Sequence, residues 1–415
     1  MRKFLVLPLF AMLLFSQCNT VDKPNVIIIY TDDQGTLDLA CYGAEDLYTP
    51  NLDQLAQNGI LFTQAYAQTV CCPSRAALLT GRHPQRAGIN NWTQNNAHAK
   101  NKGVNMPLSE ITIAEVLKEN GYTTGLFGKW HLGAAMENGP LEQGFDEFYG
   151  FRGGFIDNYT HYFLHGKGFH DLWDNKEEIF DRGNYFPRLM TEQTIEFIEK
   201  NKDQPFFIYA AFNLPHYPEQ PDSLFSHSYD DIDEPRKSYA KVVTAVDGRI
   251  GRIIDKLKEL DIYENTAVFY MSDNGHSTEE TMIRFDDHNS GIPKGTNYCA
   301  NGGGGYTGKW RGAKGSFFEG GVRVPAIISY PAKFKKGQVR DQIISGMDFL
   351  PTICEITGTE LPDCTLDGYN ILPIIKSAKA VSQHEILYFQ WEDQWAVRDG
   401  RWKLIVKGRD TTGKF

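Results

Sequence analysis

The sequence has few cysteines, no excess of basic residues and no apolar run long enough to cross a membrane. Seven of its 415 residues are cysteine, and none forms the paired CxxC spacing of a zinc site. Its 42 lysines and arginines are outnumbered by 52 aspartates and glutamates, so the formal charge is −10. This acidic balance argues against a nucleic-acid partner. A composition of 41% hydrophobic and 23% charged residues excludes disorder, collagen and coiled coil for the chain as a whole.

The first twenty residues have the pattern of a targeting segment. Arg2 and Lys3 form a charged start, and residues 4–15 form an apolar run that is too short to span a membrane. Cys18 lies where a lipoprotein signal places its lipidated cysteine, although Gln17 is bulkier than the residue usual there. We therefore expect a signal peptide over residues 1–18 and export to the periplasm or cell surface. Membrane attachment through a lipid on Cys18 is one alternative.

Export would permit disulfides, and the remaining cysteines suggest one pair. Cys354 and Cys364 are close enough in sequence to pair across a short loop. The adjacent Cys71 and Cys72 make a poor disulfide framework and need another explanation.

From residue 25 onward, β-branched and aromatic runs alternate with segments of helical spacing. Strands are expected at residues 25–30, 123–127, 205–211, 266–271 and 325–329, and helices at 51–58, 111–120, 191–200 and 241–260. The alternation predicts an α/β fold with a large, mostly parallel sheet sandwiched by helices. Short strands at 386–390, 395–399 and 402–407 predict a small C-terminal antiparallel subdomain. We expect the main domain over residues 24–357 and this subdomain over 358–415.

One segment carries the most specific chemical signal. Residues 71–82 read CCPSRAALLTGR, which resembles the C-x-P-S-R-x-x-x-L-T-G-R motif of the formylglycine-dependent sulfatases, within the alkaline-phosphatase-like superfamily. The resemblance implies that Cys71 is oxidised to formylglycine and that Cys72 occupies the variable position. A hydrated aldehyde has two hydroxyls on one carbon. One attacks the sulfur of a sulfate ester, and loss of the other proton then expels sulfate, so one hard displacement becomes two easier steps.

Acidic residues follow two of the predicted strands at their carboxyl ends. Asp32 and Asp33 end the first strand, and Asp273 and Asn274 come after the strand at 266–271. Ligands of open α/β sheets bind at that edge, and oxygen donors of this kind suit Ca²⁺ or Mg²⁺ rather than zinc. The resemblance implies one Ca²⁺, with Mg²⁺ as the less favoured ion, held by these four residues together with Cys71.

The resemblance also assigns the cations and histidines around this pair of strands. Arg75 would steady the formylglycine, and Lys129 and Lys314 would bind sulfate oxygens as point charges. His131 would orient a hydroxyl and accept its proton, and His216 would be the general acid for the leaving alcohol. The matching segments are FGKWHLG at 127–133, NLPH at 213–216 and RGAKG at 311–315.

Variable loops would select the sugar. The candidates are Asn90–Trp92, Arg152 with Asp157–His161, His170–Trp173 and Arg284–Asn289. Trp92 and Trp173 could stack on a sugar face, and Arg284 and His288 could bind a uronate or a second sulfate. Each is equally typical of an ordinary surface loop. His276 follows Asn274 closely and is expected near the metal.

The resemblance extends from about residue 25 to residue 407 and implies an exported sulfatase that removes O-sulfate from a sulfated carbohydrate. Its maturation would need a formylglycine-generating or sulfatase-maturing enzyme as partner. A formylglycine-dependent phosphonate or phosphodiester hydrolase is one alternative, because paired lysines bind either tetrahedral anion. A catalytically dead carbohydrate-binding relative is another. Gln34-Gly35-Thr36 departs from the usual Leu-Gly-Trp, and relatives often continue beyond the position of Phe415, so an incomplete C-terminal subdomain is expected.

Overall fold

The computed structural model describes residues 23–93, 96–99, 103–298 and 303–412. The predicted signal peptide with Cys18, and also Cys299, lie outside these residues. Among the residues described, no helix is both long and apolar enough to cross a membrane.

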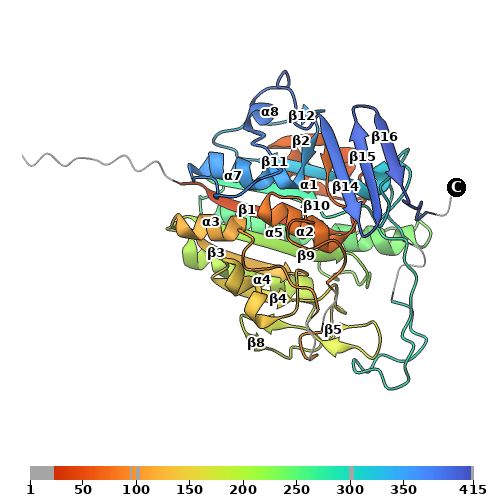
Figure 1. Ribbon diagram of the computed structural model, residues 1–415. Coiled ribbons are helices and arrows are strands. Elements are labelled where there is room, and N and C mark those ends of the chain that lie inside the picture. Colours follow the sequence, from red (N-terminus) through yellow and green to blue (C-terminus); the bar gives the residue numbers. More distant parts are fainter. Residues whose placement is uncertain (1–22, 94–95, 100–102, 299–302, 413–415) are drawn as a thin grey trace, which may run out of the picture.

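A large mixed sheet forms the centre of the molecule (Figure 1). Its parallel centre consists of β10 (Thr266–Ser272), β1 (Asn25–Asp32), β9 (Phe206–Pro215), β3 (Thr123–Lys129) and β4 (Glu147–Phe151), in that order. Beyond β10 lie β11 (Arg323–Ser329), β2 (Ile60–Tyr66), β12 (Gln338–Arg340) and β13 (Ile344–Ser345), and beyond β4 lie β7 (Trp173–Asp174) and β8 (Glu177–Glu178). The pair β5 (Tyr162–Phe163) and β6 (Phe169–His170) forms a separate small sheet. The predicted α/β class is confirmed.

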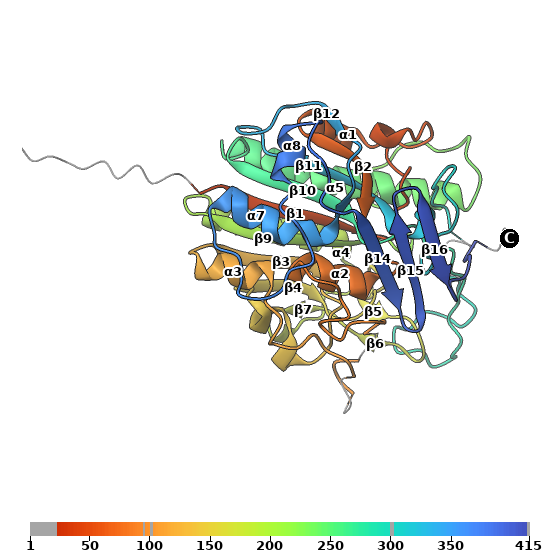
Figure 2. The same ribbon diagram turned by 45° about the horizontal axis from the view of Figure 1, so that its top comes forward.

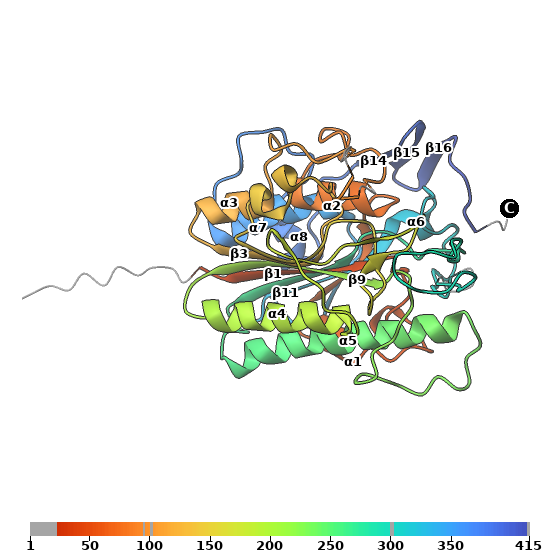
Figure 3. The ribbon, with the colours of Figure 1, turned by 90° about the horizontal axis from the view of Figure 1, so that it is seen from below.

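Helices cover both faces of this sheet, as Figure 3 shows edge-on. One face carries α1 (Pro50–Gln57), α4 (Phe186–Asn201) and α5 (Arg236–Glu259), and the other carries α2 (Cys71–Thr80), α3 (Ile113–Glu119), α7 (Phe349–Thr357) and α8 (Leu372–Lys376). Side chains of β1 alternate between the two layers: Val26, Ile28 and Tyr30 pack on the α2 side, and Ile27 and Ile29 on the α5 side. A strand buried on both faces must be apolar throughout, which explains its continuous β-branched run.

Short elements complete the chain. They are α6 (Glu319–Val322) and the 3₁₀ turns η1 (Ala40–Tyr42), η2 (Met136–Asn138), η3 (Pro140–Gln143) and η4 (Gly346–Asp348).

The predicted C-terminal subdomain is a three-stranded antiparallel sheet of β14 (Ile386–Trp391), β15 (Gln394–Asp399) and β16 (Trp402–Val406). Figure 2 shows it beside the main sheet. Leu387, Phe389 and Ala396 pack against Tyr66 of β2 and Phe317. Its apolar face is therefore completed by residues of the main domain, whereas the boundary at 357/358 stays a prediction.

The predicted Cys354–Cys364 disulfide is wrong, because both cysteines are free thiols. Cys354 is on the core side of α7 and packs inside the apolar cluster of that face. Cys364 is in the following loop, beside the charges of Arg82 and Glu110. The disulfide was predicted from the short sequence separation alone, which does not show that α7 directs Cys354 into the core.

Candidate active site

The parallel strands bring the predicted site residues to one edge of the sheet. Thr31 of β1 pairs with Ser272 of β10, so Asp32, Asp33 and Asp273 follow adjacent strand ends. Lys129 ends β3, and His216 follows β9, which pairs with both β1 and β3. Because parallel strands share the direction of their carboxyl ends, residues far apart in sequence converge here.

Cys71 is the first residue of α2 and faces this edge. Its Sγ lies 3.3 Å from Asp32 Oδ1 and 3.9 Å from Asp33 Oδ1. Cys72 points the other way, into the apolar core, where its Sγ accepts a hydrogen bond from Thr93 N at 3.2 Å. Consecutive residues of a helix point in different directions, so Cys71 lies in the site and Cys72 lies in the core.

Three buried ion pairs hold the carboxylates. Lys129 Nζ lies 2.6 Å from Asp32 Oδ2, and Lys314 Nζ lies 2.8 Å from Asp33 Oδ2. Arg75 Nη2 lies 2.8 Å from Asp273 Oδ2. Arg75 also donates to the carbonyl of Lys129, at 3.2 Å. Buried charges are tolerated only when they are paired in this way.

Burial and neighbouring charges set the ionisation of these groups. Burial raises the pKa of Asp33 to about 6 against the effect of Lys314, and burial with the charge of Asp32 raises the pKa of Asp273 to about 7. At Asp32, burial is the largest single effect, but the neighbouring cations, Lys129 foremost, together outweigh it, and the pKa lies well below the ordinary value. Burial, Asp273 and Asp32 together raise the pKa of the Cys71 thiol well above its ordinary value. The carboxylates therefore crowd negative charge around a protonated thiol.

The same cluster fits a cation. Single ligand atoms of Asp32, Asp33, Cys71 and His216 all lie within 4.8 Å of one another and are buried. Asn274 donates to Asp33 Oδ1 at 2.7 Å, while its own buried Oδ1 has no hydrogen-bond partner within the described part of the chain. Buried polar atoms are nearly always paired, so an orphaned oxygen on a side chain that contacts Asp33 fits a cation as its partner.

The two predicted histidines border the cluster differently. His216 Nδ1 lies 2.7 Å from the carbonyl of Tyr217, and its Nε2 lies 3.6 Å from Asp33 Oδ2. Both ring nitrogens of His131 lack a hydrogen-bond partner among the residues described. Burial lowers the pKa of both imidazoles, with Lys129 adding to the effect at His131 and Lys314 at His216. Asp33 and His131 also adopt left-handed backbone conformations, with φ of 61° and 56°, a strain typical of functional sites.

A small cavity opens above these groups, and we call it the reaction pocket. Its volume is about 180 Å³, and its walls are Cys71, Trp92, His131, Gly154, Phe155, His165, His216, Tyr217, Glu279 and Lys314. Five of these wall residues were expected from the sequence, and the other five, Gly154, Phe155, His165, Tyr217 and Glu279, belong to none of the motifs.

Of these five residues, Glu279 has a carboxyl group and His165 has an imidazole. Glu279 Oε2 lies 3.7 Å from Lys314 Nζ, and its side chain is 45% exposed. It lies in the Gly-rich stretch 275–313, and a loop of that length is usually functional. No sequence pattern indicated a function for His165.

The predicted sugar-binding loops divide into two groups. Trp92 lines the reaction pocket, and Arg284 lines a neighbouring hollow. Trp173 and His288 were wrong as sugar contacts, because both are buried. The Arg152 guanidinium covers the Trp173 ring at 4.4 Å, and His288 bonds to Ser290 Oγ and the Leu164 carbonyl.

Several of the other predicted loop residues make hydrogen bonds within the fold. Asp157 accepts hydrogen bonds from the backbone of Tyr159 and Thr160, and His170 bonds to Glu178. His276 is buried, and its carbonyl accepts a hydrogen bond from the backbone N–H of Lys314.

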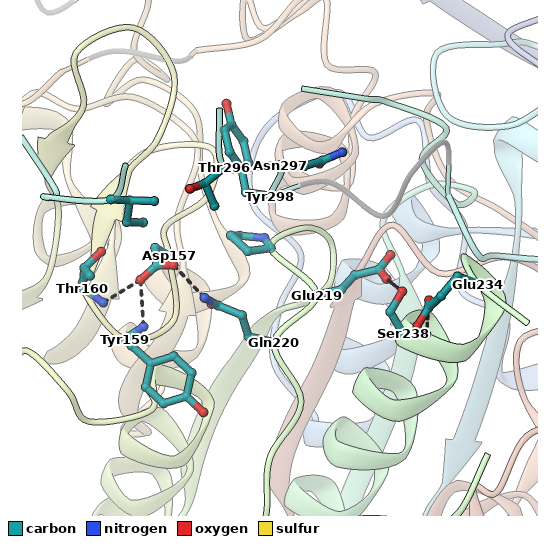
Figure 4. Close-up of a pocket in the computed structure, with 12 residues that line it drawn as sticks. Asp157, Tyr159, Thr160, Glu219, Gln220, Glu234, Ser238, Thr296, Asn297 and Tyr298 are labelled. Atoms are coloured by element: carbon teal, nitrogen blue, oxygen red, sulfur yellow. Dashed lines mark hydrogen bonds between the residues drawn. The ribbon is translucent and has the colours of Figure 1, made fainter. Parts of the chain in front are cut away.

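A larger hollow of about 610 Å³ is lined in part by Glu219 and Gln220 (Figure 4). Its acidic lining consists of Asp157, Glu219 and Glu234, and none of the described residues that line it is basic. Burial raises the pKa of Glu219 to about 8. The hollow therefore offers no cation to an anionic sulfate group, so size alone does not identify the reaction site.

Comparison with known proteins identifies the family. The sequence profile of the sulfatase family matches residues 24–359, most of the chain. The chain belongs to the sulfatase family. A second profile, described as N-sulphoglucosamine sulphohydrolase, C-terminal, matches residues 310–411 of this sulfatase.

Individual relatives agree. This sulfatase is 33% identical over 401 residues to N-acetylgalactosamine-6-sulfatase of Mus musculus, covering 92% of this chain and 71% of the relative. It is 32% identical over 405 residues to arylsulfatase A of Homo sapiens, covering 92% and 74%. It also matches the crystal structure of Ps i-CgsB in complex with k-i-k-neocarrahexaose, with a TM-score of 0.78, 30% identity and coverage of 92% and 84%. The protein is therefore an enzyme of the alkaline-phosphatase-like superfamily that hydrolyses sulfate esters.

Proposed function

We propose that this sulfatase removes O-sulfate groups from a sulfated carbohydrate after Cys71 has been converted to formylglycine. The observation that carries the proposal is the position of Cys71, which faces a pocket shared with Lys314, His131 and His216. Burial raises the pKa of the unmodified thiol, and a protonated thiol is a poor nucleophile, which supports conversion of this position to a different group. Ps i-CgsB, of similar fold, holds a carbohydrate ligand, which favours a sugar substrate.

The metal of this proposal is Ca²⁺, held by Asp32, Asp33, Asp273 and Asn274 together with the group at position 71. These residues supply hard oxygen ligands, and the free Oδ1 of Asn274 supports their assignment. When bound, the cation would offset the negative charge of the carboxylates and of a sulfate oxygen.

The cations of the site have roles that follow from their present partners. Lys129 and Lys314 now neutralise Asp32 and Asp33, and with a metal on those carboxylates their ammonium groups would be available to sulfate oxygens. Arg75 is anchored by Asp273 and by the Lys129 carbonyl, so it fixes the start of α2 rather than moving with substrate.

The histidines move the protons. His216 Nδ1 donates to the Tyr217 carbonyl, which leaves Nε2 facing the pocket, where it would protonate the leaving alcohol oxygen. A neighbouring sulfate anion would favour the charged imidazolium needed for that step. His131, whose nitrogens are unpaired in the residues described, would accept the proton of the hydroxyl at position 71. Overall, water supplies one hydrogen to the alcohol and the oxygen that completes sulfate.

The proposal extends to the cell. Residues 1–18 would direct export to the periplasm or cell surface, with Cys18 as the site of a lipid anchor, and a formylglycine-generating enzyme would mature the protein.

The test is sulfate release from defined sugars. Protein with conversion of Cys71 verified by mass spectrometry is incubated with sulfates of galactose, galactosamine, glucosamine, uronic acid and rhamnose, and with a phosphonate monoester. We expect release from one sugar class and none from Cys71→Ala. Faster turnover of the phosphonate than of every sulfate would contradict the proposed substrate class.

A further inference from the structure

A second hollow adjoins the reaction pocket and shares His165 with it. This hollow has a volume of about 400 Å³ and is lined by the loop at residues 164–166, by residues 281, 282, 284 and 285, and by Tyr298. His165 also lines the reaction pocket, so the two spaces meet at this residue. We call the second space the Arg284 hollow.

The Arg284 hollow combines apolar and cationic groups. The side chains of Met282 and Phe285 are 49% and 39% exposed, so they offer an apolar surface of the kind on which sugar C–H groups pack. Arg284 is exposed and has neither an ion pair nor a hydrogen bond in the described part of the chain. An unpaired guanidinium beside an apolar surface suits a sugar that carries an anionic group.

The distribution of charge around the reaction pocket indicates where an anionic sugar chain would leave it. The large hollow of Figure 4 has carboxyl groups and no basic residue among those that line it, so it offers no partner to an anionic polymer. Within the reaction pocket itself, Glu279 disfavours a second anion on the same sugar as the scissile sulfate. The Arg284 hollow is the neighbouring space that offers a cation.

We propose that the sugar chain passes from the reaction pocket over His165 into the Arg284 hollow, where Arg284 binds an anionic group on the neighbouring sugar. The inference rests on the proposed function, because it assumes a sulfated carbohydrate in the reaction pocket. The group that Arg284 binds is an oxyanion. Its source is either a second sulfate or the carboxylate of a uronate.

Binding without turnover tests the subsite. In full-length protein carrying Cys71→Ala, calorimetry measures the Kd of k-i-k-neocarrahexaose, of a tetrasaccharide of uronic acid and N-acetylgalactosamine 6-sulfate, and of galactose 6-sulfate. Addition of Arg284→Gln should weaken one oligosaccharide about tenfold and leave the monosaccharide unchanged. The oligosaccharide affected identifies sulfate or carboxylate as the anion. Arg284→Lys should restore part of the affinity, and Arg252→Gln, an exposed arginine on α5, should change nothing.

Three results would overturn the subsite: unchanged oligosaccharide affinity in Arg284→Gln, equal weakening of the monosaccharide, or no oligosaccharide binding by the parent. Sulfate release separates this failure from failure of the proposed function. If converted parent and Arg284→Gln release sulfate equally from all substrates, the function stands and the subsite fails. If the converted parent releases no sulfate at all, the proposed function fails.

Discussion

Cys71 and Cys72 are adjacent in the sequence but have opposite environments. Cys71 faces three carboxylates, whereas Cys72 is fully buried in the apolar layer between α2 and the sheet. Substitution of Cys71 should therefore affect activity, and substitution of Cys72 should affect stability.

We expect Cys72→Ala to keep sulfatase activity and to lower the free energy of unfolding by about 1 kcal/mol, because a small core group and one hydrogen bond to sulfur are lost. Urea unfolding and sulfate release measure the two effects. Cys71→Ala is the matched control and should lose activity. Inactivity of fully converted Cys72→Ala protein would show that Cys72 takes part in the site.

Glu279 is the acidic side chain that substrate meets in the reaction pocket. Its pKa is held below the ordinary value, where Lys314 and hydrogen bonds from Ser277 and Tyr217 outweigh burial. The group is therefore an anion at neutral pH.

Glu279→Gln should raise kcat/KM for a monosaccharide with two sulfates relative to one with a single sulfate, by about threefold to tenfold, since removal of one charge at short range is worth about 1 kcal/mol. Steady-state kinetics on the two sugars measures the ratio. The exposed neighbour Glu280 supplies the control Glu280→Gln. An unchanged ratio in Glu279→Gln would leave Glu279 with a positioning role toward Lys314 only.

At the scale of elements, the site depends on the parallel register of β10, β1, β9 and β3. The parallel register brings the carboxylates of Asp32, Asp33 and Asp273 together at adjacent strand ends. Their negative charges repel one another unless a positive charge compensates them. A cation shared by β1 and β10 should therefore stabilise the sheet edge itself.

Removal of metal by EDTA should lower the melting temperature and abolish activity, and Ca²⁺ should restore both. At a hundredfold excess over Kd, one bound ion adds about 2.7 kcal/mol to stability. Calorimetric melting curves follow the change, and Asn274→Ala should shift the calcium dependence to higher concentration. Identical melting curves with EDTA and with Ca²⁺ would contradict a metal at this edge.

The elements also show what the sequence predicted and what it did not. The buried strands β1, β9 and β10 were predicted because both faces are covered, which makes each a continuous apolar run. The half-buried β2, which has polar Thr63 and Gln64, was missed. Motif residues were located because each motif is local in sequence. Glu279 and His165 reach the pocket on loops whose packing is long-range, and no local pattern encodes that.

At the scale of the whole molecule, the C-terminal sheet contacts a wall of the reaction pocket. Trp391 at the end of β14 contacts the Trp92 ring, with centroids 5.0 Å apart, and its Nε1 donates to Asn91 Oδ1 at 3.0 Å. Trp92 is a wall of the pocket. The subdomain therefore supports a substrate contact although none of the predicted catalytic residues lies in it.

Trp391→Ala should raise KM severalfold and change kcat by less than twofold, because it frees Trp92 without touching the groups around Cys71. Initial rates at varied substrate concentration separate the two constants. Trp402→Ala, an exposed tryptophan on β16, is the control. A fall in kcat at unchanged KM would contradict this support role.

The burial of α2 has a consequence for the order of events in the life of the protein. All ten residues of this helix are buried, and Cys71 is 1% exposed. A modifying enzyme must surround the side chain that it oxidises, and the reaction pocket of about 180 Å³ leaves no room for it. The proposed conversion of Cys71 therefore belongs to the interval before folding, while the chain is still extended. A molecule that folds first would be stable and inactive, and only unfolding would give it a second opportunity to mature.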